Sequence, residues 1–329
     1  MSNPTIDQLY QDLISGDRSA LSRSITLIES KSDKHIASAG ELLNRCLNTS
    51  GNSIRIGITG SPGVGKSTFI NAFGHYLIQQ HNKRVAVLAI DPSSTLTGGS
   101  ILGDKTRMAD LASSEHAFVR PSPSGGDLGG VAAGTRESIL LCEAAGFDVI
   151  LIETVGVGQS EIAVYDMVDL FLLLIQPGSG DDLQGIKRGI MEMADVIVVN
   201  KSDGSLESNA KETAGFYAQA VGFIHPQRPN WKIDVQRVSS VTGEGLEKLW
   251  QTMVRFEDGQ QQNGDWQANR SRQNQRWFQY HLEQELLRRI RTSEHVKNQA
   301  SEMEKPVEMG EVHPLMAARK VADDFFNRG

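Results

Sequence analysis

One nine-residue segment constrains the fold of this chain more than any other. GSPGVGKST, residues 60–68, follows the apolar run IRIGIT and precedes an amphipathic segment over residues 66–80. It fits the pattern G-x-x-x-x-G-K-[ST], in which a strand, a glycine-rich loop and a helix hold phosphate groups. The glycines let backbone N–H groups converge on phosphate oxygens, and the start of the helix adds partial positive charge. The segment therefore predicts an α/β nucleotide-binding domain.

Short aliphatic runs alternate with amphipathic segments through the middle of the chain. The runs are IRIGIT, RVAVLAI, FDVILIE, DLFLLLI, DVIVV and, more weakly, KIDVQRV. The segments 66–80, 131–145, 184–193, 206–221 and 245–255 have the length and pattern of covering helices. Because such apolar runs suit strands that are buried on both faces, we expect a doubly wound, mostly parallel α/β sheet.

Helical segments flank this domain on both sides. Apolar residues recur at helical spacing between residues 5 and 47. A Gln- and Asn-rich stretch after residue 256 resembles a connection or a polar helix start, and WFQYHLEQELLRRI and HPLMAARKVADDFF beyond it have helical patterns. We therefore expect an N-terminal helical extension (1–50), a P-loop domain (51–256) and a C-terminal helical arm (257–329). The arm is too small to bury much by itself, so it must pack on the domain or on a second subunit.

The phosphate loop assigns roles to particular side chains. Lys66 can reach the β- and γ-phosphates, and the hydroxyl of Ser67 can bind Mg²⁺. The residues expected to contact the nucleotide here are Gly60, Ser61, Pro62, Gly63, Val64, Gly65, Lys66, Ser67 and Thr68.

Two later segments predict which base is bound. NKSD, residues 200–203, follows the run DVIVV, and its Asp203 can accept hydrogen bonds from guanine N1–H and N2–H₂. Adenine has neither donor, so a buried carboxylate aimed at it would lose its partners. SSVTGEG, residues 239–245, follows another run and could close over the guanine O6 with backbone N–H groups. The nucleotide is therefore expected to be GTP.

Acidic residues at strand ends predict the metal side of the site. Asp91 ends the second strand of the expected sheet, Asp104 lies in a glycine-rich segment, and Glu153 ends a buried strand where the Mg²⁺-side carboxylate of such enzymes lies. Gly156 is placed to donate its N–H to a γ-phosphate. Acidic residues at these positions are alternatively helix caps or turn formers.

The residues that follow suggest slow hydrolysis by the isolated chain. In Ras-like GTPases a Gln after the switch glycine orients the attacking water, but here that position is Val157. A third glycine-rich loop, residues 177–189, carries Lys187 and Arg188. One of these cations could approach the γ-phosphate; the alternative is a solvated loop with a basic helix start.

Composition narrows the remaining functional classes. The net charge of -7 disfavours a broad nucleic-acid surface. The longest aliphatic or aromatic run, LFLLLI, is too short to span a bilayer, and the N-terminus lacks the pattern of a signal peptide. The two cysteines, Cys46 and Cys142, lie far apart, which suits a reducing cytoplasm and disfavours a metal-insertion GTPase that needs clustered Cys and His ligands.

Four motifs in a fixed order resemble one family of GTPases. They are DPSS with GGSILGDKTRM, ETVGVGQSE, PGSGDDLQGIKRG and NKSD. Together they are similar to the MeaB/ArgK family of methylmalonyl-CoA mutase-associated GTPases (MMAA-like, SIMIBI class), and the likeness covers nearly the whole chain. The resemblance implies homodimers formed through a helical extension and an adenosylcobalamin-dependent acyl-CoA mutase as partner. GTP would gate the loading and protection of the cobalamin, which would bind to the partner and not to this chain.

The resemblance also implies site residues. Ser67, Asp91, Asp104 and Glu153 would form the Mg²⁺ and hydrolysis site, and the loop 177–189 would relay the nucleotide state to the mutase. The guanine would be held by Asn200, Lys201, Asp203, Ser239, Ser240 and Val241.

A phosphotransferase is the leading alternative. Members of the same family have been labelled ATPases or kinases of a lysine/arginine/ornithine transport system. NKSD argues against ATP, and the sequence has no dedicated catalytic loop for a protein acceptor. Asp91 could nonetheless act as a base toward a hydroxyl group, so this alternative stays open.

Overall fold

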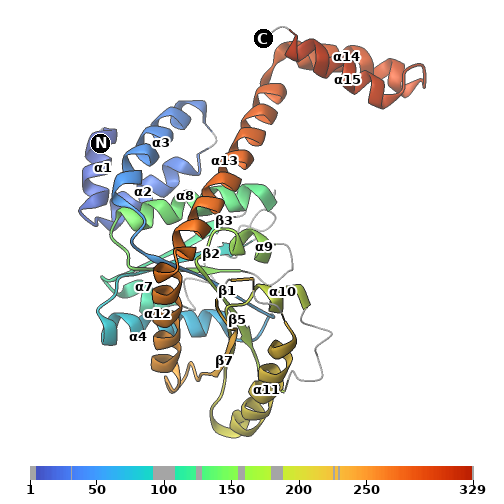
Figure 1. Ribbon diagram of the computed structural model, residues 1–329. Coiled ribbons are helices and arrows are strands. Elements are labelled where there is room, and N and C mark those ends of the chain that lie inside the picture. The colour runs from blue at the N-terminus through green and yellow to red at the C-terminus, as the bar shows by residue number, and fades with distance from the viewer. Residues whose placement is uncertain are drawn as a thin grey trace. The chain divides into compact units, whose positions relative to one another are not determined.

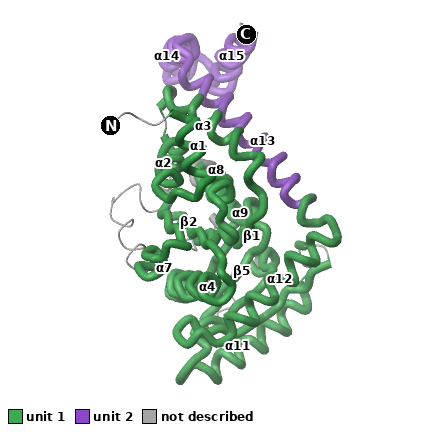
Figure 2. Tube along the Cα trace, turned by 90° about the vertical axis from the view of Figure 1, so that its left-hand side faces the viewer, with its two compact units in different colours: residues 1–267 green, residues 268–329 purple. Residues whose placement is uncertain are grey.

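The computed structural model of the chain comprises two compact units. The structure describes residues 5–30, 32–91, 108–123, 128–154, 160–178, 188–224, 227–228 and 230–327. Unit 1 comprises residues 1–267 and unit 2 comprises residues 268–329 (Figure 2).

A sheet of seven parallel strands forms the centre of unit 1, in the order β3-β2-β4-β1-β5-β6-β7 (Figure 1). The strands are β1 (Ile54–Gly60), β2 (Val85–Asp91), β3 (Ala117–Pro123), β4 (Val149–Glu153), β5 (Leu170–Ile175), β6 (Val196–Val199) and β7 (Asp234–Arg237). This sheet confirms the predicted doubly wound α/β fold.

Helices cover both faces of the sheet, and the N-terminal helices pack outside them. The longer helices of unit 1 are α1 (Ile6–Ile14), α2 (Arg18–Ile28), α3 (Asp33–Cys46), α4 (Lys66–His81), α8 (Leu128–Ala144), α11 (Glu207–Ala220) and α12 (Leu246–Gln262). The shorter ones are α7 (Ala109–Ser113), α9 (Ser160–Tyr165), α10 (Arg188–Met193) and the 3₁₀ turns Leu47–Thr49, Gly204–Leu206 and Val221–Phe223. Within the described ranges, every helix is too short or too polar to cross a bilayer.

Successive side chains of the strands enter different hydrophobic cores. Ile56 and Ile58 of β1 pack with Phe69 and Phe73 of α4 and with residues of α12. On the opposite face, alternate residues of β2 and β4 pack with α8 and α9. The strands are therefore apolar on both faces, which explains why their runs in the sequence are continuously aliphatic rather than alternating.

The N-terminal helices pack on α8 and form part of unit 1. Leu21 and Ile25 of α2 share a core with Cys142 and its neighbours on α8. The buried Glu143 of α8 accepts hydrogen bonds from the Gly51 backbone N–H (2.9 Å) and from Nε of Arg55 (2.8 Å). This one carboxylate therefore stabilises the segment that connects the N-terminal helices to β1.

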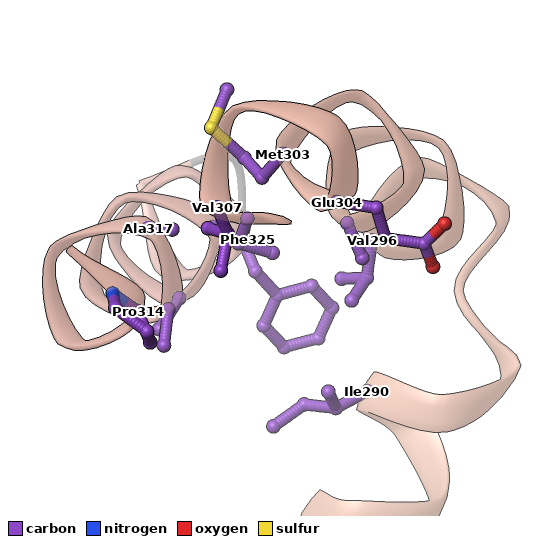
Figure 3. A pocket seen from close by; sticks show the side chains of 12 residues that line it. Ile290, Val296, Met303, Glu304, Val307, Pro314, Ala317 and Phe325 are labelled. Atoms are coloured by element: carbon purple, nitrogen blue, oxygen red, sulfur yellow. The ribbon is translucent and has the colours of Figure 1, made fainter. Parts of the chain in front are cut away.

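Unit 2 consists of the end of a long helix and a helical hairpin. The helices are α13 (Asp265–Thr292), which starts in unit 1, α14 (Glu294–Glu308) and α15 (Pro314–Phe326). An apolar pocket of about 400 Å³ lies in this unit. Figure 3 shows Phe325 of α15 and Ile290 of α13 lining it together with Val296 and Met303 of α14. This hairpin leaves a partly open apolar groove.

A single glycine sets how closely α9 packs on β1. A Cβ atom at Gly57 would lie 2.8 Å from Cδ2 of Phe171 and 2.9 Å from Cγ1 of Val164. We expect Gly57→Ala to lower the free energy of unfolding by about 1–3 kcal/mol, because the packed side chains must move apart. Denaturant unfolding of the full chain measures this change.

Gly40 provides the matched control. It lies in α3, and a Cβ atom there would meet nothing within 4 Å. Gly40→Ala is expected to raise the free energy of unfolding by up to about 1 kcal/mol, through helix propensity. Equal stability of Gly57→Ala and the parent chain would contradict the close-packing argument.

Candidate nucleotide-binding site

The candidate site lies at the carboxyl edge of the sheet, around β1. After β1 the chain passes β4 and enters β2. After β4 it passes β1 in the opposite direction and enters β5. The direction of winding therefore reverses beside β1. In open α/β sheets, ligands bind at such a reversal, outside the carboxyl ends of the strands.

The phosphate loop needs glycine at two positions for different reasons. At Gly60 (φ 154°) an added Cβ would lie 2.5 Å from the carbonyl oxygen of Leu174, so a side chain would collide with β5. Gly65 adopts φ 93° at the N-cap of α4, in the left-handed region that favours glycine. The loop can therefore turn sharply from β1 into the helix. Val64, by contrast, has a buried side chain in the core, so only its backbone is available to a ligand.

Lys66 is held over the loop by backbone carbonyl groups. Its Nζ donates hydrogen bonds to the carbonyl oxygens of Gly60 (2.7 Å) and Ser61 (3.4 Å). Burial lowers the pKa of Lys66, while the charges of Glu153 and Glu161 act to raise it. Phosphate oxygens of a bound nucleotide could accept from the same amine.

The metal side of the site brings two predicted residues together. The hydroxyl of Ser67 donates to Oε1 of Glu153 at 3.2 Å, and Glu153 ends β4. Asp91 ends the neighbouring strand β2, where Ala89 pairs with Glu153. Hydroxyl and carboxylate oxygens are the hard donors that Mg²⁺ prefers. The residues present therefore fit Mg²⁺, which would supply positive charge for phosphate oxygens when it is bound.

Three predicted site residues lie outside the described residues: Asp104, Gly156 and Lys187. Among the residues that are described, no group of three or more His, Cys, Asp or Glu side chains could hold a metal ion by itself. A complete Mg²⁺ ligand set would therefore need the hydroxyl of Ser67, the phosphate oxygens, or residues beyond the described ranges.

The predicted guanine motif contacts the phosphate loop directly. Nδ2 of the buried Asn200 donates to the carbonyl oxygen of Val64 at 3.0 Å, and Nζ of Lys201 donates to that of Gly63 at 2.7 Å. These bonds join the end of β6 to the end of β1. Asn200 and Lys201 therefore support the phosphate loop in this structure.

The loop after β7 contacts Asp203, the acidic residue of the NKSD motif. The Ser239 hydroxyl donates to Oδ1 of Asp203 at 2.7 Å, and the Ser240 hydroxyl donates to Oδ1 of Asn200 at 2.7 Å. Oγ of Ser239 in turn accepts from the backbone N–H groups of Val241 (3.2 Å) and Thr242 (3.0 Å). Both predicted guanine segments thus form one hydrogen-bonded unit with the phosphate loop. Their roles toward a base stay predictions.

One buried acidic residue was missed by the sequence reasoning. Glu161 on α9 is 1% exposed, and its charge acts on Lys66. The signal that could have found it is helical spacing, because Glu161 precedes the apolar Val164 by three residues, which places both on one face of α9.

The chain is similar to known proteins over nearly its whole length. A family model described as "Methylmalonyl Co-A mutase-associated GTPase MeaB" matches residues 21–295. A Mycobacterium tuberculosis protein named as a GTPase is 49% identical over 319 residues, covering 97% of this chain and 95% of the relative. The "Methylmalonic aciduria type A homolog, mitochondrial" of Mus musculus is 43% identical over 333 residues, covering 98% and 80%. A crystal structure described as that of an LAO/AO transport system kinase is similar with a TM-score of 0.75, 34% identity and 99% coverage of both chains.

Asp203→Asn tests the base assignment. Asparagine would offer the base one acceptor oxygen and one donor, so the paired hydrogen bonds to guanine N1–H and N2–H₂ would be lost. We expect GTP affinity to fall by about 10²-fold or more, with the preference for GTP over ATP largely removed. Competition of GTP and ATP for a fluorescent nucleotide measures both quantities.

The exposed Glu207, at the start of α11, serves as the control for this substitution. Glu207→Gln should retain the affinity and preference of the parent chain. An intact GTP preference in Asp203→Asn would reject the assignment of the guanine site.

Proposed function

Because the chain belongs to the family of methylmalonyl-CoA mutase-associated GTPases and is itself a GTPase, we propose that it controls an adenosylcobalamin-dependent acyl-CoA mutase. In this proposal, GTP binding and hydrolysis gate the loading and protection of the mutase's cobalamin. The main support is the family match over residues 21–295, which includes the phosphate loop and the guanine motif. The cobalamin belongs to the partner, and this chain contributes the nucleotide cycle.

The residues around the phosphate loop suggest how the cycle is built. We propose that Lys66, which donates to the loop carbonyl of Gly60, binds phosphate oxygens, and that Ser67 with its partner Glu153 forms part of the metal side. We propose that Asp91 and Asp104 complete the metal side, that Gly156 donates its N–H to the γ-phosphate, and that Lys187 supplies a cation there. Since Val157 replaces the water-orienting Gln of Ras-like GTPases, we expect slow hydrolysis until a partner completes the site.

The proposed site of action is the cytoplasm. Both cysteines, Cys46 and Cys142, are free thiols buried in the core, and burial raises the pKa of Cys46 to about 11. Protonated, buried thiols suit a reducing compartment. The mouse relative is described as mitochondrial, a location that belongs to that protein.

The mutase proposal is tested by GTP and ATP hydrolysis with the full chain, alone and with methylmalonyl-CoA mutase. We expect slow, GTP-specific turnover that rises at least several-fold with the mutase, because the partner would complete the catalytic site. Lys66→Ala should remove both the basal and the stimulated rates, which shows that the turnover comes from this chain.

Two other outcomes of this assay would contradict the mutase proposal. A GTPase rate that is indifferent to the mutase would reject the partner. ATP turnover equal to GTP turnover, together with transfer of labelled γ-phosphate to a protein, would favour the alternative of a transport-system kinase. That alternative draws on the structural neighbour, which is described as an LAO/AO transport system kinase.

We further propose that the C-terminal arm forms a homodimer. On α13, Phe278, Leu282 and Leu286 are 63%, 43% and 40% exposed and recur every four residues, so they share one helix face. The apolar groove of the α14–α15 hairpin adds a second partly open surface in the same unit (Figure 3). Exposed apolar surfaces of this kind are typical of protein interfaces.

Substitution on this face tests the dimer. In the full chain, Phe278→Glu combined with Leu282→Glu should lower the solution mass from dimer to monomer, because charges would be buried in the interface. Gln284→Glu, on an exposed residue of the same helix, is the matched control and should remain dimeric. Light scattering gives the mass, and a parent chain that is already monomeric would reject the proposal.

A further inference from the structure

Two threonine hydroxyl groups meet in the buried interior beside the phosphate loop, and the predicted site residues include neither of them. Oγ1 of Thr154 donates to Oγ1 of Thr59 at 2.9 Å, and the two residues are 0% and 1% exposed. A buried hydroxyl group lowers stability unless it is hydrogen-bonded, and two apolar groups of the same shape are often equally stable in its place. Stability alone therefore does not require hydroxyl groups at this position.

The hydrogen bond joins the ends of two neighbouring strands at the candidate site. Thr59 precedes Gly60, the first residue of the phosphate loop. Thr154 directly follows β4, which ends at Glu153. The backbone N–H of Thr154 also donates to the carbonyl oxygen of Ile58 at 3.0 Å. Both the main chain and the side chain of Thr154 therefore hold the end of β4 against β1.

Glu153 and Thr154 point to opposite faces of the sheet. Successive side chains of a strand alternate between its two faces. Leu151 of β4 packs in the core on the α4 side, and Ile152 packs in the core on the α8 and α9 side. By the same alternation Glu153 faces α4, where the Ser67 hydroxyl donates to its Oε1 at 3.2 Å, and Thr154 faces α9. The end of β4 is thus held by side-chain contacts on both faces.

We propose that Thr154 is a positioning residue for the metal side of the site. Its side chain is fully buried and acts through the neighbouring Glu153, whose carboxylate it keeps directed at Ser67 and at the Mg²⁺ expected there. Without the hydrogen bond to Thr59, the contact on the α9 face would be lost and the carboxylate could turn away. The proposal rests on the Mg²⁺ site proposed above and names the hydrogen bond that orients its acidic ligand.

Thr154→Val in the full chain tests the proposal, because valine keeps the shape of the side chain and removes its hydroxyl group. The measured quantity is the gain in affinity that Mg²⁺ provides for a fluorescent, non-hydrolysable GTP analogue, from titrations in Mg²⁺ and in EDTA. We expect this gain to fall about tenfold, since metal affinity depends on the groups that orient the ligands. The affinity in EDTA should stay unchanged, because the phosphate loop and the guanine segments keep their residues.

A double variant separates positioning from a general effect on the fold. Thr154→Val alone leaves the buried Thr59 hydroxyl without this partner and should lower the free energy of unfolding. Thr59→Val combined with Thr154→Val leaves no hydroxyl group at the contact, so stability should return to that of the parent chain while the Mg²⁺ gain stays low. Thr154→Ser retains the hydroxyl group and should retain the gain. Recovery of the gain in the double variant would make the pair purely structural and overturn the proposal.

Thr252→Val is the matched control at another buried threonine. The Thr252 hydroxyl accepts from Nε2 of Gln236 at 2.7 Å, between α12 and β7, and β7 lies three strands from β1 in the sheet. This variant should lower stability and leave the Mg²⁺ gain unchanged.

The remaining outcomes distinguish the role of Thr154 from the metal site itself. An unchanged gain in Thr154→Val, when the parent chain responds to Mg²⁺, overturns the role of Thr154 and leaves the metal site standing. A parent chain that binds the analogue equally well in Mg²⁺ and in EDTA rejects the metal site and this proposal with it. If Thr154→Val does not fold, the gain in the double variant decides.

Discussion

The close packing of β1 between its neighbours is the constraint on which the rest of this structure depends. β1 pairs with β4 and β5 along its edges, α4 and α12 cover one face, and α9 presses on the other at Gly57. Since close-packed interiors tolerate little displacement, the last residue of β1 has a defined position. The phosphate loop, the end of β4 and the start of α9 are all placed relative to that residue.

The nucleotide site is assembled from strand ends that are distant in sequence. Asn200 and Lys201, after β6, donate to carbonyl groups of the phosphate loop, while Ser239, after β7, orients Asp203. These hydrogen bonds connect the loop that is expected to bind phosphate with the segments that are expected to bind guanine.

Helices and strands could be predicted where the residue types of a segment alone define them. They could not be predicted where the position of the segment in the fold decides its structure. Six strands were predicted from aliphatic runs, but β3 contains Pro121 and Pro123 and was missed; an edge strand tolerates proline because one side needs no partner. The sequence predicts either a connection or a helix start for the polar stretch after Phe256. In the structure α12 continues to Gln262 and α13 begins at Asp265, since glutamine and glutamate favour helices and Gln260 is buried.

The sequence by itself determined the phosphate loop, the parallel α/β sheet and the family, because each depends on local patterns of residue type. Only the tertiary structure decided which distant groups meet: Asn200 with Val64, Ser239 with Asp203, and Ser67 with Glu153. The physical reason is that these contacts follow from strand order and from the direction of crossover helices. Neither property is encoded in any single segment, so no local pattern could reveal them.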